Sequence, residues 1–479
     1  MNVDATTGPA PAATAPAAGV GWPRTKGSWI HGWDAEDTQQ WEGGGRAIAT
    51  RNLRWSIACE FLGFVVWQLW SIVVVYLPAA GFHFSSAELF WLISMPSLTG
   101  ATLRIPYTFM VARFGGRNWT ITSALLLLVP TLGLAACTAN PGTPFGVMLA
   151  VAALAGLGGG NFASSMANIT HFFPAREKGW ALGLNAAGGN LGAAVAQLMV
   201  PVAVTALAAG TLGLPLAGLV WVPLIALAAW GAWKYMDNLS GATSDIAGSL
   251  ACLKEPHLWI LALLYVGTFG SFIGFSAVFP KLIVDSFGPH VGFTLGTATI
   301  SLAFLGALVG SLARPYGGRL ADRWGGARVT VACFAILALT ALAQLLTLPL
   351  GSFPLFIALF LVLFAAAGAG NGSTYRMIPV VFALRSRSRG GGPGGGPDGS
   401  PGGGPGGGPA RRAAAALGLI SALGAYGGFL VPQVLNASRL ATGSYAGAFT
   451  GFVAAYLLLM AVTWFTYLRR SPAASLAGI

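Results

Sequence analysis

Two arginines stand inside long apolar segments of this 479-residue chain. Arg104 lies in Leu-Arg-Ile-Pro-Tyr and Arg314 lies in Ala-Arg-Pro-Tyr. A guanidinium presents a planar fork of donors that matches an oxyanion bidentately, and an arginine inside an apolar segment is expected to face a cavity or a partner. Glu60 is the only carboxylate clearly within these segments. The pattern therefore predicts a positively charged internal cavity that binds a small anion.

The composition indicates that these segments cross a bilayer. Hydrophobic residues make up 55% of the chain and charged residues only 8%, whereas about a quarter of the residues in a soluble domain are charged. A crossing takes about 20 apolar residues. We expect helices near 56–80, 88–113, 118–138, 145–172, 179–205, 213–236, 256–285, 292–320, 327–349, 353–383, 412–438 and 445–468. The predicted fold class is an all-α membrane protein with 12 transmembrane helices, in which the first span is not a signal peptide.

The formal net charge of +12 is distributed unevenly between the loops. Of the 26 lysines and arginines, 21 fall on the side of the termini, and only Lys281 and Arg439 fall opposite. By the positive-inside rule, we expect a multi-pass protein whose N and C termini are both cytoplasmic. This placement makes the lipid bilayer the partner of the chain and excludes nucleic acid.

An internal repeat divides the chain. Arg104 and Arg314 are 210 residues apart, as are Arg113 and Arg323, and Gly160-Asn161 and Gly370-Asn371. The repeat predicts two pseudo-symmetric six-helix halves with a substrate site near the membrane midplane between them. The expected boundaries are 1–50 for a partly disordered cytoplasmic segment, 51–238 for the N-terminal half, 239–255 for a linker, 256–470 for the C-terminal half with a Gly/Pro-rich cytoplasmic loop at 385–411, and 471–479 for the tail.

No catalytic constellation is found in the sequence. The four cysteines are scattered, and the five histidines lie in the tail or near span ends. We therefore expect no metal, no cofactor, no catalytic residue and no enzymatic activity. Tyr265 and Phe269, at i and i+4, share one helix face, where their rings can either pack in the core or flank a planar anion.

Glu60 and Arg376 allow two interpretations each. Glu60 is expected about one turn inside the first span, where it meets Arg54 or the membrane interface, or where it carries protons. Arg376 lies seven residues from the cytoplasmic end of its predicted helix, close enough to snorkel to the surface rather than face the cavity.

Longer motifs carry a resemblance to a known family. Gly318-Arg-Leu-Ala-Asp322-Arg323-Trp-Gly-Gly-Ala-Arg328 resembles the loop motif of the major facilitator superfamily. Gly158-Gly-Gly-Asn-Phe-Ala-Ser-Ser-Met-Ala-Asn168, together with Gly370-Asn-Gly-Ser-Thr374, resembles the signatures of the nitrate/nitrite porter (NarK-type) family. The resemblance extends from Trp33 onward and implies the major facilitator fold, in a multi-pass protein of the bacterial cytoplasmic (inner) membrane.

The resemblance also implies a function and a binding site. The function is alternating-access transport of nitrate and nitrite, with antiport as the expected mode, proton-coupled nitrate symport as the alternative, and a monomer as the working unit. The implied substrate-binding residues are Arg104, Arg314, Phe162, Asn190, Tyr265, Phe269, Gly418 and Ser421. Two positions depart from the family pattern: Ala186 replaces a glycine, and Glu60 replaces a position that is usually apolar. Glu60 leaves the choice between exchange and proton coupling open.

Overall fold

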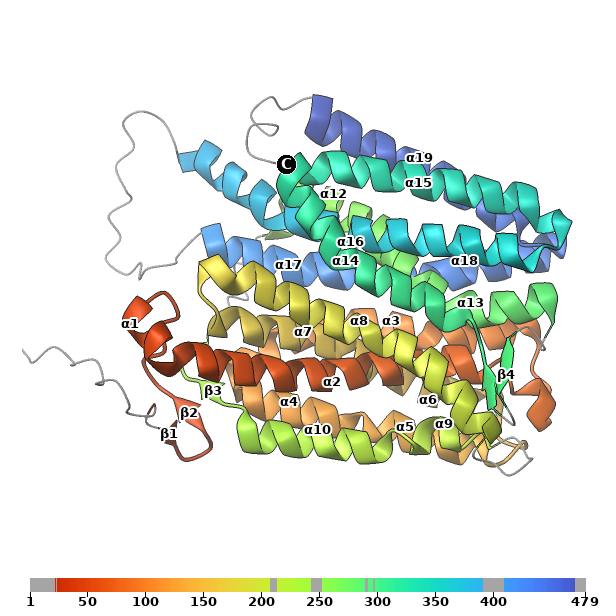
Figure 1. Ribbon diagram of the computed structural model, residues 1–479, viewed down its shortest axis with the longest axis horizontal. Helices are drawn as coiled ribbons and strands as arrows, with labels where there is room; N and C mark the ends of the chain where they lie inside the picture. The colour runs from red at the N-terminus through yellow and green to blue at the C-terminus, as the bar shows by residue number, and fades with distance from the viewer. Residues whose placement is uncertain are drawn as a thin grey trace, which may run out of the picture.

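The computed structural model describes residues 22, 24–206, 213–242, 252–288, 292–295, 298–390 and 409–469. Long helices run side by side along one axis (Figure 1). The short strands β1 (Arg24–Thr25), β2 (Trp29–Ile30) and β3 (Asn238–Leu239) lie at one end of the bundle, here called the proximal end. Strands β4 (Phe293–Leu295) and β5 (Ala298–Ile300) lie at the other, here called the distal end.

The helices of the first half occupy the lower part of the view in Figure 1. They are α2 (Arg46–Val73), α3 (Ser86–Phe114), α4 (Gly116–Leu126) with α5 (Leu128–Thr138), α6 (Phe145–Leu154) with α7 (Gly156–Phe172), α8 (Ala175–Ala206), and α9 (Leu216–Leu219) with α10 (Val222–Tyr235). Shorter turns are α1 (Thr38–Gln40), η1 (Trp41–Gly45) and η2 (Pro78–Ala80). These helices account for the first six predicted spans.

The second half repeats the pattern in the upper part of the view. Its helices are α12 (Pro256–Tyr265) with η3 (Val266–Gly270) and α13 (Ser271–Phe287), α14 (Ala303–Trp324), α15 (Gly326–Thr347) with η4 (Leu348–Leu350), α16 (Phe353–Gly390), α17 (Pro409–Ala425) with α18 (Gly427–Thr442), and α19 (Ala446–Thr463) with η5 (Trp464–Arg469). The predicted fold of two six-helix halves is confirmed.

Two of the twelve crossing helices stand apart in composition. Within the described part of the chain, ten segments are long and apolar enough to span a membrane, and α3 and α14 are not among them. Their 29 and 22 residues correspond to lengths of about 43 Å and about 33 Å, which suffice for a crossing. These two helices carry Arg104 and Arg314, and a buried arginine lowers the mean hydropathy of its helix.

Some predicted boundaries differ from the structure. The eighth span was expected from 292, but β4 and β5 pair there as antiparallel strands and α14 begins at Ala303. The first span begins at Arg46 rather than 56, because the polar residues before the apolar run continue the same helix. Helices α16 and α17 extend into the predicted loop 385–411, and 391–408 lie outside the described residues.

The two halves share one turn geometry. Gly115 follows α3 with φ 87° and Gly325 follows α14 with φ 89°. A positive φ is strained for a residue with a Cβ, so glycine is required where the chain reverses directly into α4 and α15. The two turns are 210 residues apart, which matches the internal repeat of the sequence.

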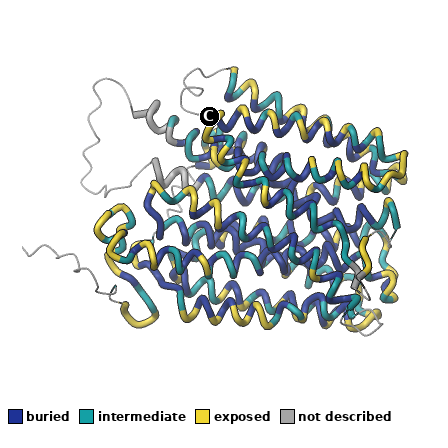
Figure 2. Tube along the Cα trace, viewed as in Figure 1, coloured by how far each residue is buried: buried dark blue, intermediate teal, exposed yellow. Residues whose placement is uncertain are grey.

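Burial follows the arrangement expected in a bilayer. The inner faces of the helices are buried, and exposed residues lie along the outside and at the ends of the bundle (Figure 2). Large apolar side chains are among the exposed ones, for example Leu339 at 66% and Leu346 at 68%. A water-soluble protein rarely exposes so much apolar surface, whereas lipid tails solvate it.

Asp237 fastens the N-terminal segment to the proximal end. Its carboxylate accepts from Arg24 Nε at 2.7 Å, Arg51 Nη2 at 2.5 Å and Asn52 Nδ2 at 3.1 Å. Strand β2 pairs with β3 directly beside it. The described residues from Arg24 onward are therefore anchored to the bundle, although the sequence suggested partial disorder in 1–50.

At the distal end, Asp285 forms ion pairs with Lys281 and Arg439, the two cationic residues that the sequence analysis placed opposite the termini. Lys281 Nζ lies 3.0 Å from Asp285 Oδ1, and Arg439 Nη1 donates to Asp285 Oδ2. The Tyr445 hydroxyl also donates to Oδ2, at 2.5 Å. Burial, followed by the nearby Asp285 carboxylate, raises the pKa of Tyr445 and keeps this hydroxyl a donor. Lys281 and Arg439 are therefore both ion-paired.

Asp237→Asn should lower the free energy of unfolding by about 2 kcal/mol, because a buried charged acceptor for two arginines becomes a neutral amide. Thermal unfolding in detergent, followed by size-exclusion fluorescence, measures the change. Arg46→Gln is the control, since its ion pair with Glu177 is long at 3.6 Å and exposed. Equal melting temperatures for the two variants would contradict this account of Asp237.

Candidate functional site

Arg104 connects the two halves of the protein. It lies in the middle of α3 with 0% exposure, and Arg314 lies in α14 with 5% exposure. Arg104 Nε donates to the carbonyl of Gly159 on α7 at 3.1 Å, and Nη1 donates to the carbonyl of Ser421 on α17 at 3.0 Å. Because α7 and α17 belong to different halves, this single guanidinium bridges the interface between them.

Glycines bring the arginine helices close to their neighbours. Gly100 and Gly310 each lie four residues before an arginine, on the same helix face. A Cβ on Gly159 would lie 3.0 Å from Gly100 Cα, and one on Gly368 would lie 2.1 Å from the Gly310 carbonyl oxygen. The backbones of α3 and α7, and of α14 and α16, therefore touch one turn away from each arginine.

Aromatic rings surround the guanidiniums. The Phe162 ring lies 4.5 Å from Arg104 Cζ and 5.6 Å from Arg314 Cζ, and the Phe269 ring lies 5.0 Å from Arg104 Cζ. Phe162 and Phe269 stack with centroids 6.3 Å apart, and Tyr265 stacks on Phe269 at 5.2 Å. These five predicted residues, drawn from both halves, therefore gather around one point. Ring faces attract cations, so they hold the guanidinium planes in place.

Several buried polar atoms on the helices that carry the site have no hydrogen-bond partner among the described residues. Buried polar groups are normally paired, so the unpaired nitrogen on each arginine is available to a polar ligand or water. The buried unpaired atoms include Arg104 Nη2, Arg314 Nη1, Tyr265 Oη, Thr374 Oγ1, and the side-chain amides of Asn161, Asn190 and Asn371. Asn161 and Asn371 are 210 residues apart, so the two halves contribute matching groups.

The remaining predicted residues lie on α8 and α17. Asn190 is 0% exposed on α8, and its amide is unpaired. Ser421 takes part through its backbone carbonyl, which accepts from Arg104. A Cβ on Gly418 would approach Thr108 Cγ2 of α3 to 3.2 Å, so this glycine allows α17 to lie close to α3.

Sequence reasoning missed two aromatic residues. Arg104 Cζ also lies 5.3 Å from the Trp67 ring, and Arg314 Cζ lies 5.5 Å from the Tyr375 ring. Tyr375 directly follows the Gly370 to Thr374 motif, a position that could have singled it out. Trp67 had no such signal, because its segment is rich in aromatic residues throughout.

Arg376 lies at the surface and not in the buried cluster around Arg104 and Arg314. Its Nε donates to Asp322 Oδ1 at 2.5 Å, and both side chains are about half exposed. The interpretation that Arg376 reaches the surface is therefore correct. The arginine ties α16 to α14 at the proximal end.

Glu60 is placed differently from the expectation. Since α2 begins at Arg46, Glu60 lies about four turns into the helix and is only 1% exposed. It accepts hydrogen bonds from Ser165 on α7 and from Asn185 Nδ2 on α8, the latter at 2.6 Å. The expected contact with Arg54 or the membrane interface is wrong, because Arg54 is exposed while Glu60 lies among helices of the interior.

The halves also meet on the distal side of the arginines. Gln197 Nε2 donates to the Ser276 carbonyl at 2.7 Å, and Gln433 Nε2 donates to Ser94 Oγ at 2.7 Å. Lys281 Nζ lies 5.4 Å from the Phe90 ring of the other half. These contacts hold the two halves together between the arginines and the distal end.

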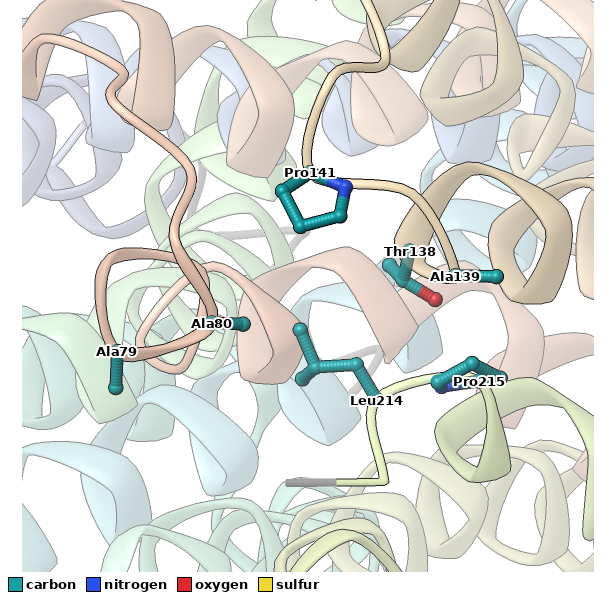
Figure 3. Close-up of a pocket in the computed structure, with 7 residues that line it drawn as sticks. All are labelled: Ala79, Ala80, Thr138, Ala139, Pro141, Leu214 and Pro215. Carbon is teal, nitrogen blue, oxygen red and sulfur yellow. The ribbon is translucent and has the colours of Figure 1, made fainter. Parts of the chain in front are cut away.

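Two surface hollows are poor alternatives for a site. One of about 510 Å³ lies between η2, the end of α5 and the start of α9, and its lining has no charged side chain (Figure 3). The other, of about 810 Å³, is lined at the proximal end by residues of both signs, including Arg46 and Glu42. No metal-binding group of three or more His, Cys, Asp or Glu residues occurs in the described ranges. The buried arginine pair is the better candidate.

Twelve helices in two related halves around a buried cationic centre define a membrane transporter. The family model of the Major Facilitator Superfamily matches residues 59–393, and the chain belongs to this superfamily. The human organic anion transporter MFSD10 has the same fold, with a TM-score of 0.57 and 15% identity over 88% of this chain and 99% of its own.

Relatives with similar sequences show to which family of the superfamily the chain belongs. Nitrate/nitrite transporter NarU of Salmonella typhimurium is 43% identical over 92% of this chain and 96% of its own length. Probable nitrate/nitrite antiporter NarK2 of Thermus thermophilus is 36% identical over 93% of this chain and 98% of its own. The chain therefore belongs to the nitrate/nitrite porter family and is not an enzyme.

Gly368→Ala should lower the melting temperature by several degrees, because its methyl group would overlap the backbone of α14 and force α14 and α16 apart. Thermal unfolding in detergent measures the effect. Gly318→Ala, the same change on the neighbouring helix α14, is the control, since a Cβ there meets nothing within 4 Å. It should be neutral or slightly stabilising. A tolerated Gly368→Ala would show that the close contact is dispensable.

Proposed function

We propose that this protein exchanges nitrate for nitrite by alternating access. The observation that carries the proposal is the placement of Arg104 and Arg314 against the shared Phe162 ring at the interface between the halves. Each guanidinium retains an unpaired buried nitrogen. A small planar anion with two or three oxygens fits such donors, and relatives named as nitrate/nitrite transporters support this substrate class.

The proposed binding site assigns a role to each predicted residue. Arg104 and Arg314 donate to the anion oxygens, and Phe162, Tyr265 and Phe269 enclose its planar faces. Asn190 adds an amide donor. Ser421 accepts from Arg104 through its backbone carbonyl, and Gly418 leaves room for the Thr108 side chain of α3. These two contacts connect α17 to the arginine helix of the other half, so that anion binding at Arg104 affects both halves.

Exchange follows from the charge of the site. Two buried guanidiniums repel each other strongly when no anion lies between them, and this repulsion opposes the closure needed to change sides. A bound anion offsets the repulsion, so the loaded protein reorients and the empty one stalls. An anion must therefore be bound for each crossing, which is the condition for antiport.

The proposal also covers the membrane location, the orientation and the working unit of the protein. The excess of cationic residues on the side of the termini supports cytoplasmic termini, and the bacterial relatives support a location in the bacterial cytoplasmic (inner) membrane. We place the boundaries of the halves at 51–238 and 256–470, joined by the linker 239–255, and take the monomer in its lipid bilayer as the working unit. Nitrate and nitrite are the partners, in a role such as nitrate assimilation.

Proton-coupled nitrate symport is the second candidate function. The observation in its favour is the buried Glu60, since the described spans hold no histidine near the arginines that could carry a proton. Symport and antiport differ in one measurable respect. A symporter moves nitrate without an anion on the far side, and an antiporter does not.

Labelled nitrate should enter proteoliposomes that contain nitrite or nitrate and should not enter anion-free ones, because the empty site stalls. Collapse of a pH gradient should leave the exchange rate unchanged. Initial uptake rates with and without internal nitrite measure the effect. Gradient-driven uptake into anion-free vesicles would instead establish proton coupling.

Arg104→Lys and Arg314→Lys should each reduce exchange at least about 100-fold, because an ammonium keeps the charge but loses the planar fork. Exchange rates, normalised to folded protein in the vesicles, measure the loss. Arg376→Lys is the matched control, since its partner is the exposed Asp322. Near-normal exchange by either site variant would remove that arginine from the site.

A further inference from the structure

Glu60 belongs to a small polar cluster within the N-terminal half. Ser165 Oγ and Asn185 Nδ2 both donate to Glu60 Oε2, and Asn185 Nδ2 also donates to Ser165 Oγ. Ser56 Oγ extends the cluster, at 3.0 Å from Ser165 Oγ. The other carboxyl oxygen, Glu60 Oε1, has no hydrogen-bond partner within the described part of the chain.

The surrounding helices are shaped to hold this carboxyl group. A Cβ on Gly189 of α8 would lie 2.3 Å from Glu60 Oε1, so only glycine leaves room for the group there. One turn before Ser165 on α7, the side-chain amide of Asn161 is buried and unpaired. Phe64, one turn after Glu60 on α2, has its ring 6.2 Å from that of Phe162, the ring that contacts both guanidiniums, so the Glu60 cluster lies one helix turn from the wall of the candidate anion site.

Several charged and titratable groups face Glu60. Arg104 on α3 and Arg314 on α14 are both near enough to interact with its charge, and so is Tyr375 on α16. From α7 and α8 it meets the neutral side chains of Ser165 and Asn185. On its own helix, Arg51 is engaged by Asp237 at the proximal end. Arg104 and Arg314 are therefore the cations whose charge acts on the Glu60 carboxylate.

We infer that Glu60 is a proton-binding site linked to the anion site, with Oε1 as the atom that takes the proton. The inference rests on the proposed function, because it needs an anion between the arginines. An anion offsets the positive charge that favours the ionised carboxylate, so anion binding draws a proton onto Oε1. By reciprocity, protonation of Glu60 strengthens anion binding by the same factor.

Proton linkage at Glu60 is compatible with exchange. If nitrate and nitrite bind with the same proton uptake, each inward crossing carries the proton that each outward crossing returns. The net proton flux is then zero, and a pH gradient does not drive exchange. The pH shared by both sides still sets the anion affinity, which distinguishes linkage from proton-coupled transport.

Proton uptake on anion binding can be measured directly. Nitrate binding to the purified full chain is titrated calorimetrically in buffers of different ionisation enthalpy, across about pH 5 to about pH 9, where carboxyl groups in buried settings titrate. Wild type should take up a fraction of a proton per nitrate, and its affinity should fall roughly tenfold or more from acid to alkaline pH, as for one shifted pKa unit.

Two substitutions remove the proton site. Glu60→Gln keeps the size and the acceptor for Ser165, and Glu60→Leu serves as a second neutral variant if the amide packs poorly. Both should bind nitrate without proton uptake and with an affinity that is independent of pH and close to the acid limit of wild type. Glu42→Gln, the same change at an exposed proximal position, should behave as wild type.

The outcomes separate the inference from the function on which it rests. Equal proton uptake in Glu60→Gln and wild type, or no uptake in wild type, would overturn the inference while nitrate exchange stands. Wild-type protein that binds no nitrate at any pH would overturn the proposed function, and the inference with it.

Discussion

The burial of two guanidinium groups inside an apolar bundle is the constraint on which the rest of the structure depends. An arginine at the centre of a membrane helix costs at least about 2.5 kcal/mol on insertion scales, so it must be compensated locally. Arg104 is compensated by two carbonyls, one from each half, and by three aromatic rings. These contacts leave Arg104 Nη2 without a hydrogen-bond partner, so this nitrogen can donate to an anion.

Close helix packing makes this compensation possible. A carbonyl on α7 can reach Arg104 only because Gly100 and Gly159 allow the two backbones to touch. Gly310 and Gly368 repeat the arrangement around Arg314. In a membrane, where lipid tails are as apolar as the helix surface, such small-residue contacts are a main source of helix association. The same glycines that stabilise the bundle therefore also position the charged groups.

The interface between the halves combines firm and adaptable contacts. Hydrogen bonds such as Gln197 to Ser276 join the halves on the distal side, whereas Arg104 and Arg314 each keep one nitrogen without a partner. A rocking motion of one half against the other would break the distal hydrogen bonds and give the free arginine nitrogens new partners. Glu60 lies wholly within the N-terminal half, so its cluster with Ser165 and Asn185 can move as a unit while the charge across the interface changes.

The sequence determined the class of the protein, the twelve spans, the pairing of the halves and most of the residues around the arginines. Hydropathy, charge asymmetry and the 210-residue repeat are local or periodic properties, and they are readable without coordinates. The start of α2 and the pairing of β4 with β5 were not readable, because polar residues continue the first helix and residues expected in the eighth helix form two short strands. Only the tertiary structure decided the environment of Glu60 and the roles of Trp67 and Tyr375. Their partners lie on helices distant in sequence, and which faces meet depends on how closely the glycines let those helices pack.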